Sequence, residues 1–442
     1  MIRALEKAFG MREGGRRLPA PVPPERGPFR RSFWKSPLRG AWLSSVLSAA
    51  LLPLIIVCAV TGLLSHVAYD SELAGNSVTG SDGLLSPIYG GLDWPAGWPW
   101  LYALNQGVHV VAGVAAIPIL LAKLWSVIPK LWERPAVRTA AHAVERLSLA
   151  LLVGSGLFVF FTGVLNIQIY YPWQFSFVPS HLYGSFIFLA ALVFHIVVKL
   201  PTMARAFRER GVVRPLKESA AQTTVEPVES SESVSTAPRA ATISRRGLLG
   251  AVGAASVGLG AMMVGQSVGG PLRGLAFLAP RGVDTGIGPN DFPVNKTAAS
   301  VGVTPEQTAA AWRLNVVGRF ELSLTRDDLL RLPQSSHRLP IACVEGWSTT
   351  QDWSGVPIVE LAGMAGVGEL ESVFVESLQE GGAFGQTTLN AAQAADPRSL
   401  LALTVNGADL SLDHGFPARL IVPALPGVHN TKWVERLTFQ SA

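Results

Sequence analysis

The chain has 442 residues, of which 49% are hydrophobic and only 15% charged, and it carries a net charge of +5. This length exceeds one ordinary domain, and so low a charged fraction is unusual for a wholly soluble protein, which predicts a membrane part. The surplus of Lys and Arg does not indicate nucleic-acid binding, because these residues lie between apolar runs rather than on one basic arm. The two cysteines, Cys58 in an apolar run and Cys343 in the polar half, exclude a disulfide framework.

Several apolar runs are long enough to cross a bilayer as helices, for which roughly 20 residues are needed. Four lie in the first half of the chain and a fifth follows near its middle: about 42–66, 101–127, 147–167, 181–200 and 247–270. We therefore expect an α-helical membrane bundle of four helices over residues 41–212 and a fifth anchor helix over residues 244–270.

The distribution of Lys and Arg between these runs predicts the orientation of the helices. Residues 1–40 are basic, as are the connection after the second run and the segment after the fourth, whereas the loops 67–100 and 168–180 contain neither Lys nor Arg. By the positive-inside rule the N-terminus is cytoplasmic, and five spans place the C-terminal part outside. Aromatic residues such as Trp98 and Tyr171 lie where the outer interface is expected.

Residues 213–243 differ from their neighbours in composition. Ser, Thr, Ala, Glu and Pro dominate there, and such a segment cannot bury enough apolar surface to fold, which predicts a flexible cytoplasmic linker. It is followed by Ser244, Arg245 and Arg246 directly before an apolar run, and this pattern resembles a twin-arginine export signal. The alternative is that both arginines only hold the cytoplasmic end of the fifth helix.

Histidines are concentrated in or beside the first four apolar runs. Ionisable residues inside a membrane are costly, and paired neutral imidazoles are the common axial ligands of b-type haem. His181 and His195 are 14 residues apart, which places them on one side of a helix, about 21 Å from each other. Two-haem membrane cytochromes of the b type use a similar spacing.

His109 and His181 are the first choice for a haem near the outer face, because both lie toward that side of their runs. His195 lies near the cytoplasmic end without a clear partner, since His142 is at the right level only if the third helix starts early. His66 is expected at the interface. We expect one or two b-type haems; hydrogen bonds between helices or a quinone site are the alternative uses of these imidazoles.

From residue 290 onward the composition is that of a soluble α+β domain, with short β-prone runs broken by Gly, Pro and Asn. The expected strands and helices are, in order, strands 311–317, 372–377, 400–405 and 419–422, and helices 325–331 and 358–365. Residues 290–442 have the size of one domain.

The cysteine of this half, Cys343, lies in a Gly- and Trp-rich stretch. A deprotonated thiolate is a soft metal ligand, although a lone cysteine is more often a small buried side chain. The stretches 341–348 and 353–357 favour a role of Cys343 as a metal ligand. Together with other stretches in the same order, they resemble the sulfite oxidase family of molybdopterin enzymes. The other matching stretches are 292–295, 312–314, 406–407, 414–420 and 432–433.

The resemblance implies roles for individual residues. Cys343 becomes the protein ligand of molybdenum in a Mo-molybdopterin cofactor. His414, Arg419 and Lys432 become the residues that hold the pterin and its phosphate, for which a guanidinium fork and an ammonium are suited.

The sequence departs from the sulfite-oxidising members of that family in two respects. Val344, Glu345, Gly346 and Trp347 follow the cysteine in place of a run of the Ala-Gly-Asn-Arg-Arg type, so that a sulfite-binding arginine is not supplied there. The few residues after Trp433 leave no room for an immunoglobulin-like dimerisation domain. Both features are similar to the bacterial branch that contains the periplasmic methionine sulfoxide reductase catalytic subunit.

These observations predict a molybdopterin-dependent oxidoreductase of the bacterial cell membrane with an extracytoplasmic catalytic domain. Electrons pass between molybdenum and haem b, with quinone or a membrane or cytoplasmic electron donor as the partner. The expected substrate is a small molecule or a protein sulfoxide, and membrane lipid but no nucleic acid is contacted. The alternatives are a sulfite dehydrogenase and a metal-free membrane sensor or binding module.

Overall fold

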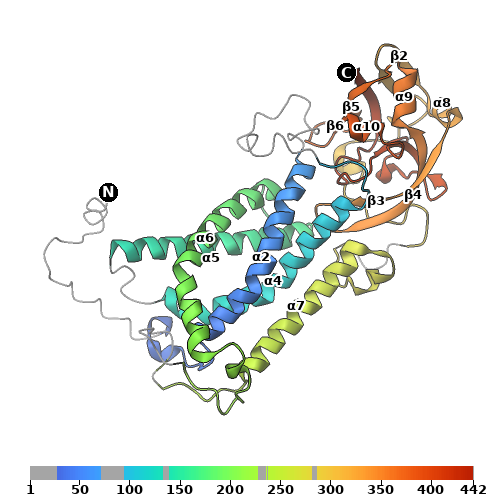
Figure 1. Ribbon diagram of the computed structural model, residues 1–442. Coiled ribbons are helices and arrows are strands. Elements are labelled where there is room, and N and C mark those ends of the chain that lie inside the picture. Colours follow the sequence, from blue (N-terminus) through green and yellow to red (C-terminus); the bar gives the residue numbers. More distant parts are fainter. Residues whose placement is uncertain are drawn as a thin grey trace. The chain divides into compact units, whose positions relative to one another are not determined.

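The structure, a computed structural model, describes residues 27–70, 94–132, 139–226, 235, 237–280 and 286–441 (Figure 1). It divides into two compact units, the first formed by Met1–Ile56 and Ala112–Gly260 and the second by Val57–Val111 and Ala261–Ala442. Each unit therefore combines segments that are far apart in the sequence. Most of the basic N-terminal segment, most of the loop 67–100 and part of the predicted linker lie outside the described residues.

In the part of the chain that the structure describes, five helices are long and apolar enough to cross a membrane. Each contains an 18-residue window with a mean hydropathy between 1.8 and 2.5. They are α2 (Ala41–Tyr69), α4 (Leu101–Leu131), α5 (Ala140–Ile167), α6 (Phe177–Arg210) and α7 (Arg245–Val268). All five coincide with the predicted apolar runs, and a strand-rich domain follows them, so the predicted fold class is confirmed (Figure 1).

The third of these helices begins earlier than its apolar run indicates. Thr139 is the N-cap of α5, and its hydroxyl oxygen accepts a hydrogen bond from the backbone N–H of His142 at 3.1 Å. His142 therefore lies in the first turn of α5. Capping, rather than hydropathy, determines where this helix starts.

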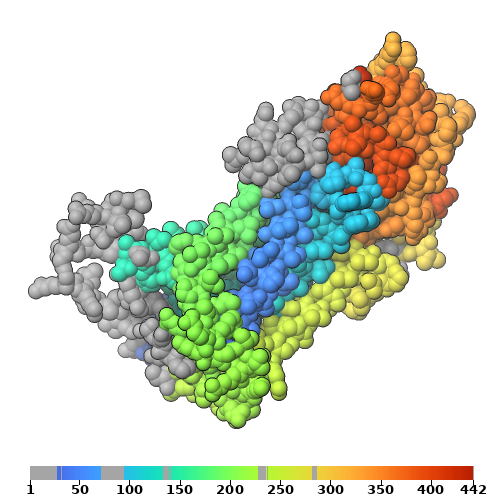
Figure 2. Space-filling view, viewed as in Figure 1, coloured from blue at the N-terminus to red at the C-terminus, as the bar shows by residue number. Residues whose placement is uncertain are grey.

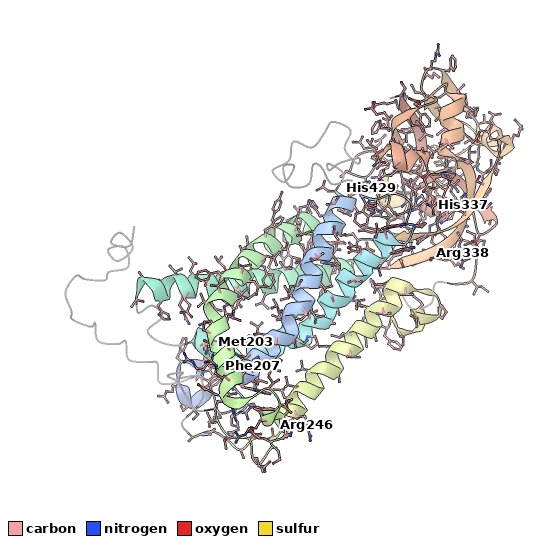
Figure 3. The ribbon with its side chains drawn as sticks, in the orientation of Figure 1. Met203, Phe207, Arg246, His337, Arg338 and His429 are labelled. Carbon is pink, nitrogen blue, oxygen red and sulfur yellow. The ribbon has the colours of Figure 1, made fainter. Side chains whose placement is uncertain are left out.

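A buried arginine begins α7 in the first unit. The guanidinium of Arg245 is fully buried and donates hydrogen bonds to a carboxylate oxygen of Glu218 at 2.9 Å and to the carbonyl oxygens of Thr224 at 2.9 Å and Pro37 at 3.1 Å. Glu218 and Thr224 belong to the predicted linker, so its described part makes specific contacts that its composition did not predict. Arg246, the second arginine of the pair, is exposed (Figure 3).

The strand-rich part of the second unit contains two five-stranded sheets. The first has the order β2-β1-β10-β5-β6, in which β10 is parallel to β1 and antiparallel to β5. Its strands are β1 (Leu314–Val317), β2 (Glu321–Leu324), β5 (Leu370–Ser377), β6 (Gln386–Asn390) and β10 (Val434–Ser441).

The second sheet has the order β3-β4-β7-β8, with β9 paired to β7. Its strands are β3 (Ser335–Ala342), β4 (Ser348–Pro357), β7 (Leu400–Val405), β8 (Ala408–Asp409) and β9 (Arg419–Ile421). The short helices α8 (Arg326–Arg331), α9 (Ile358–Met364) and α10 (Ala391–Ala395) complete the domain. Capping boxes at Thr325 and Asn390 begin α8 and α10.

The core of this domain includes residues from the N-terminal third of the chain. Trp94 and Tyr102 are 7% and 1% exposed and pack with core residues such as Val356 and Leu425. The indole Nε1 of Trp94 donates a hydrogen bond to the carbonyl oxygen of Ala424 at 2.7 Å. In Figure 2 the start of α4, in cyan, accordingly adjoins the orange and red surface of the strand-rich part.

A buried histidine contacts the C-terminal end of α2 (Figure 3). The imidazole of His429 is fully buried, with Nε2 at 3.0 Å from the carbonyl oxygen of Tyr69 and Nδ1 at 3.0 Å from the hydroxyl of Thr387. Burial lowers the pKa of His429 to about 4.

This lowered pKa predicts an acid-sensitive fold. The unfolded chain binds a proton at His429 below its ordinary pKa of about 6.5, whereas the folded chain does so only near pH 4. Stability should therefore fall as the pH decreases through this window, by at most about 3 kcal/mol. Thermal unfolding of wild type and His429→Gln at several pH values tests this, because the variant should be less stable at neutral pH and less sensitive to acid. An equal acid dependence in both proteins contradicts the prediction.

Candidate functional site

Cys343 lies in the tight turn that joins β3 to β4. The strand pairing ends at Ala342 and Ser348, and inside the turn the N–H of Cys343 donates to the carbonyl oxygen of Trp347 at 2.9 Å. The N–H of Gly346 donates back to the carbonyl oxygen of Cys343 at 3.0 Å. Gly346 has a φ of 89°, which favours glycine. The turn therefore holds Cys343 at the end of an ordered strand.

Cys343 borders a small cavity that also contains the predicted pterin-binding residues. The cavity is lined by Phe292, Pro293, Asn295, Ile341, Cys343, Trp347, His414, Arg419, Gly427 and Lys432. The structure thus brings together the four residues predicted for the molybdenum cofactor, although they come from separate segments of the domain.

Arg419 provides a buried positive charge in this cavity. It is 3% exposed, its Nη1 donates to the carbonyl oxygen of His414 at 3.2 Å, and its guanidinium lies 5.5 Å from the ring centroid of Trp353. Among the described residues its Nε has no hydrogen-bond partner and it forms no ion pair with a carboxylate. Burial lowers the pKa of Arg419 to about 9. A buried guanidinium with an unused N–H is suited to an anion such as phosphate.

Lys432 and His414 form the adjacent wall. The ammonium of Lys432 donates to the carbonyl oxygens of Lys296 and Asp413, both at 2.7 Å. The imidazole of His414 is 2% exposed and stacks on Phe292 with ring centroids 3.7 Å apart. Burial, together with the charges of Arg419 and Lys432, lowers the pKa of His414 to about 3, so His414 is neutral at physiological pH.

The lining residues fit a molybdopterin group. Cys343 supplies a soft ligand for the metal, and the orphaned Nε–H of Arg419 supplies a donor for a phosphate oxygen. The prediction named no role for Asn295, Trp347 or Gly427. Asn295 lies in the matching stretch 292–295, so the sequence could have indicated it. Nothing in the sequence indicated Gly427, whose N–H donates to the carbonyl oxygen of Ala342 at 2.7 Å.

His109 of α4 is held in a defined tautomer within the second unit. Its Nδ1 lies 3.0 Å from the carbonyl oxygen of Cys58 and 3.3 Å from the hydroxyl of Thr61. Because that hydroxyl donates its proton to the carbonyl oxygen of Val57 at 2.6 Å, it accepts from His109, so Nδ1 carries the hydrogen. The other nitrogen, Nε2, is then the one that can ligate a metal.

His181 of α6 has the same local setting within the first unit. Its Nδ1 lies 3.1 Å from the hydroxyl of Thr162, which donates its own proton to the carbonyl oxygen of Phe158 at 2.8 Å. Both threonines precede a glycine that lies against the imidazole. A Cβ on Gly62 would lie 2.8 Å from Cε1 of His109, and one on Gly163 would lie 3.3 Å from Cε1 of His181. These two Thr-Gly pairs were not predicted from the sequence.

The structure assigns no comparable setting to the third predicted haem ligand. His195 is half-buried in α6. Within the described ranges, no group of three or more His, Cys, Asp or Glu side chains is arranged to hold a metal ion. A metal held by one cysteine or by two imidazoles would not require such a group of three. The roles of Cys343, His109, His181 and His195 therefore stay predictions.

Comparison with known proteins agrees with the site in the strand-rich part. Residues 301–442 match the family model for the oxidoreductase molybdopterin binding domain. The chain is 33% identical over 134 residues to the provisionally named protein-methionine-sulfoxide reductase subunit YedZ1 of Azospira oryzae, covering 30% of this chain and 50% of that relative. It is 32% identical over 167 residues to mitochondrial sulfite oxidase of Rattus norvegicus, covering 31% of this chain and 30% of the relative. The chain thus spans about half or less of the length of these two relatives.

A third relative is matched over most of its own length. The chain is 32% identical over 151 residues to the uncharacterized oxidoreductase YuiH of Bacillus subtilis, covering 34% of this chain and 73% of YuiH. Together with the cavity beside Cys343, these matches show that the chain belongs to the oxidoreductase molybdopterin binding domain family.

Proposed function

We propose that the protein is a membrane-bound oxidoreductase in which Cys343 ligates molybdenum, and His109 and His181 are each a ligand of b-type haem. The observation that carries the proposal is the cavity in which the buried thiol of Cys343 meets the buried guanidinium of Arg419, the ammonium of Lys432 and the neutral imidazole of His414. When bound there, the molybdopterin supplies a redox-active metal that exchanges an oxygen atom with substrate.

The residues around the metal ligand would each bind or orient a part of the cofactor. Arg419 and Lys432 would neutralise its phosphate, and His414 would contact the pterin without adding a third positive charge, because its imidazole is neutral. Phe292 and Trp347 would exclude water from the metal side of the cavity. Arg419 lies on β9 and His414 at the end of a short 3-10 helix, which limits the reorganisation of these two residues on binding.

The helical part would hold the haem. Its support is the shared setting of His109 and His181, each with Nδ1–H donated to a threonine hydroxyl and each packed on a glycine. Imidazoles whose Nδ1 is held by a hydrogen bond are typical axial ligands of a b-type haem. Such a haem supplies one-electron transfer. His195 stays a candidate ligand for a second haem or a quinone site.

We infer that the substrate is a methionine sulfoxide or another S- or N-oxide. The support is the segment after Cys343, which contains no arginine, and the name carried by the YedZ1 relative. Reduction consumes two electrons and two protons per substrate and releases the oxygen atom as water. The electrons would come from a quinol or a cytoplasmic reductase by way of the haem. The positive-inside pattern supports a cytoplasmic N-terminus in a bacterial cell membrane, with the catalytic domain outside.

Metal analysis combined with optical spectroscopy tests this proposal. The purified full-length chain should contain molybdenum and should show a reduced-minus-oxidised spectrum of b-type haem. It should then reduce a sulfoxide or an N-oxide with a reduced dye as donor. A chain without molybdenum would favour the metal-free sensor, and a chain that oxidises sulfite but reduces neither oxide would reverse the direction of the reaction.

A further inference from the structure

The turn that contains Cys343 is bound by a buried glutamine of an apolar helix. Gln106 of α4 is 4% exposed, and its Nε2 donates to the carbonyl oxygen of Val344 at 2.6 Å. Its Oε1 accepts from the hydroxyl of Ser65 of α2 at 2.7 Å. Both ends of the amide are therefore used, and Val344 follows Cys343 directly in the chain. All of these residues belong to the second unit.

The end of α7 binds the next two carbonyl groups of the same turn. Gln266 donates to the carbonyl oxygen of Glu345 at 3.4 Å, and the hydroxyl of Ser267 donates to the carbonyl oxygen of Gly346 at 2.7 Å. Both side chains are buried. Three consecutive carbonyl groups after the cysteine thus receive hydrogen bonds from helical side chains outside the strand-rich fold.

Apolar packing fixes the turn at the same place. Val110, one turn after Gln106 in α4, lies against Gly346, where an added Cβ would lie 2.7 Å from its Cγ2. A side chain at position 346 is therefore excluded by α4 as well as by the positive φ of this residue.

These contacts bear on the metal ligand because a ligand must be held within fractions of an ångström of its working geometry. The strands fix the base of the turn, whereas the helices bind the carbonyl groups of the three residues that follow Cys343. We propose that Gln106 is a positioning residue of the molybdenum site, which orients the Cys343 thiolate through the carbonyl group of Val344. The inference rests on the proposed function, in which Cys343 ligates molybdenum.

Gln106 also lies close in sequence to a proposed haem ligand. It lies three residues before His109, nearly one helical turn, so the same segment of α4 contacts the turn of the molybdenum ligand and carries a proposed haem ligand.

Replacement of Gln106 by the nearly isosteric leucine in the full-length protein tests the inference. Gln106→Leu removes the hydrogen bond to Val344 and should shift the Mo(V) electron paramagnetic resonance signal and the molybdenum midpoint potential. The molybdenum and haem contents should stay at the wild-type level. Turnover should fall roughly tenfold, the factor that corresponds to the loss of about one hydrogen bond. Ser267→Ala removes the hydrogen bond to the carbonyl group of Gly346. This second variant, in which the side chain changes less, should also shift the Mo(V) signal.

Gln334→Leu is the matched control. Gln334 donates to the carbonyl oxygen of Leu329 at 2.8 Å beside the opposite end of β3, so the chemical change is the same but remote from Cys343. It should leave the signal, the potential and turnover unchanged. An unshifted signal in Gln106→Leu and Ser267→Ala, or an equal shift in Gln334→Leu, overturns the inference. A wild-type protein without molybdenum refutes the proposed function instead.

Discussion

Cys343→Ser should abolish turnover while leaving the haem spectrum intact. Serine is close to cysteine in size, so the turn between β3 and β4 should form, but its hydroxyl is a harder and much less acidic ligand than a thiol. Activity with a reduced dye and a sulfoxide should fall to the uncatalysed background. Enzyme assay, molybdenum analysis and the reduced-minus-oxidised spectrum of the same preparation measure the three effects.

The other cysteine of the chain provides a matched control for this substitution. Cys58 lies in α2 and is half-buried, and Cys58→Ser makes the same chemical change away from the cavity. This variant should retain turnover. Full activity in Cys343→Ser would show that the thiol is an ordinary buried side chain, and loss of haem in that variant would argue against two separate centres.

His109→Leu should remove the haem without removing molybdenum. Leucine fills the space of the imidazole but has no nitrogen that could ligate a metal. Turnover driven by a quinol should therefore fall to background, whereas turnover driven by a dye that reduces molybdenum directly should persist. Haem absorbance, molybdenum content and the two activities separate these effects.

A second histidine controls for the loss of an imidazole. His337 lies in β3, outside the apolar helices that contain the proposed haem ligands. His337→Leu should retain haem and quinol-driven turnover. Normal haem absorbance in His109→Leu would assign the haem to other residues and leave His109 a helix-packing residue.

The long apolar helices could be predicted from the sequence because hydropathy over such a length is a local property. The start of α5 could not, since it depends on the cap at Thr139 rather than on the apolar run. The expected strand 400–405 is present as β7, whereas the hairpin of β3 and β4 was not predicted. Pro340 and the mainly polar residues of these strands do not show a β pattern, and Pro340 is tolerated because β3 is an edge strand.

The residues of the cavity were predictable to the extent that they lie in motifs. Cys343, His414, Arg419 and Lys432 each stand in a matching stretch, and the structure places them around one cavity. The hydrogen bond from Gln106 to Val344 joins residues 238 positions apart, so no local pattern can indicate it. The burial of Arg245 likewise depends on Glu218 and on backbone carbonyl groups that composition assigned to a linker.

The discontinuous second unit has a consequence for biosynthesis. The bond from Trp94 to Ala424 spans 330 positions, and that from His429 to Tyr69 spans 360. Contacts of such separation form late, because the cost of closing a long loop precedes any gain from the contact. Trp94 and Tyr69 leave the ribosome 330 and 360 residues before their partners Ala424 and His429. A nascent chain that stops before residue 424 would lack both partners, so these buried contacts of the second unit can form only after that part of the chain has been synthesised.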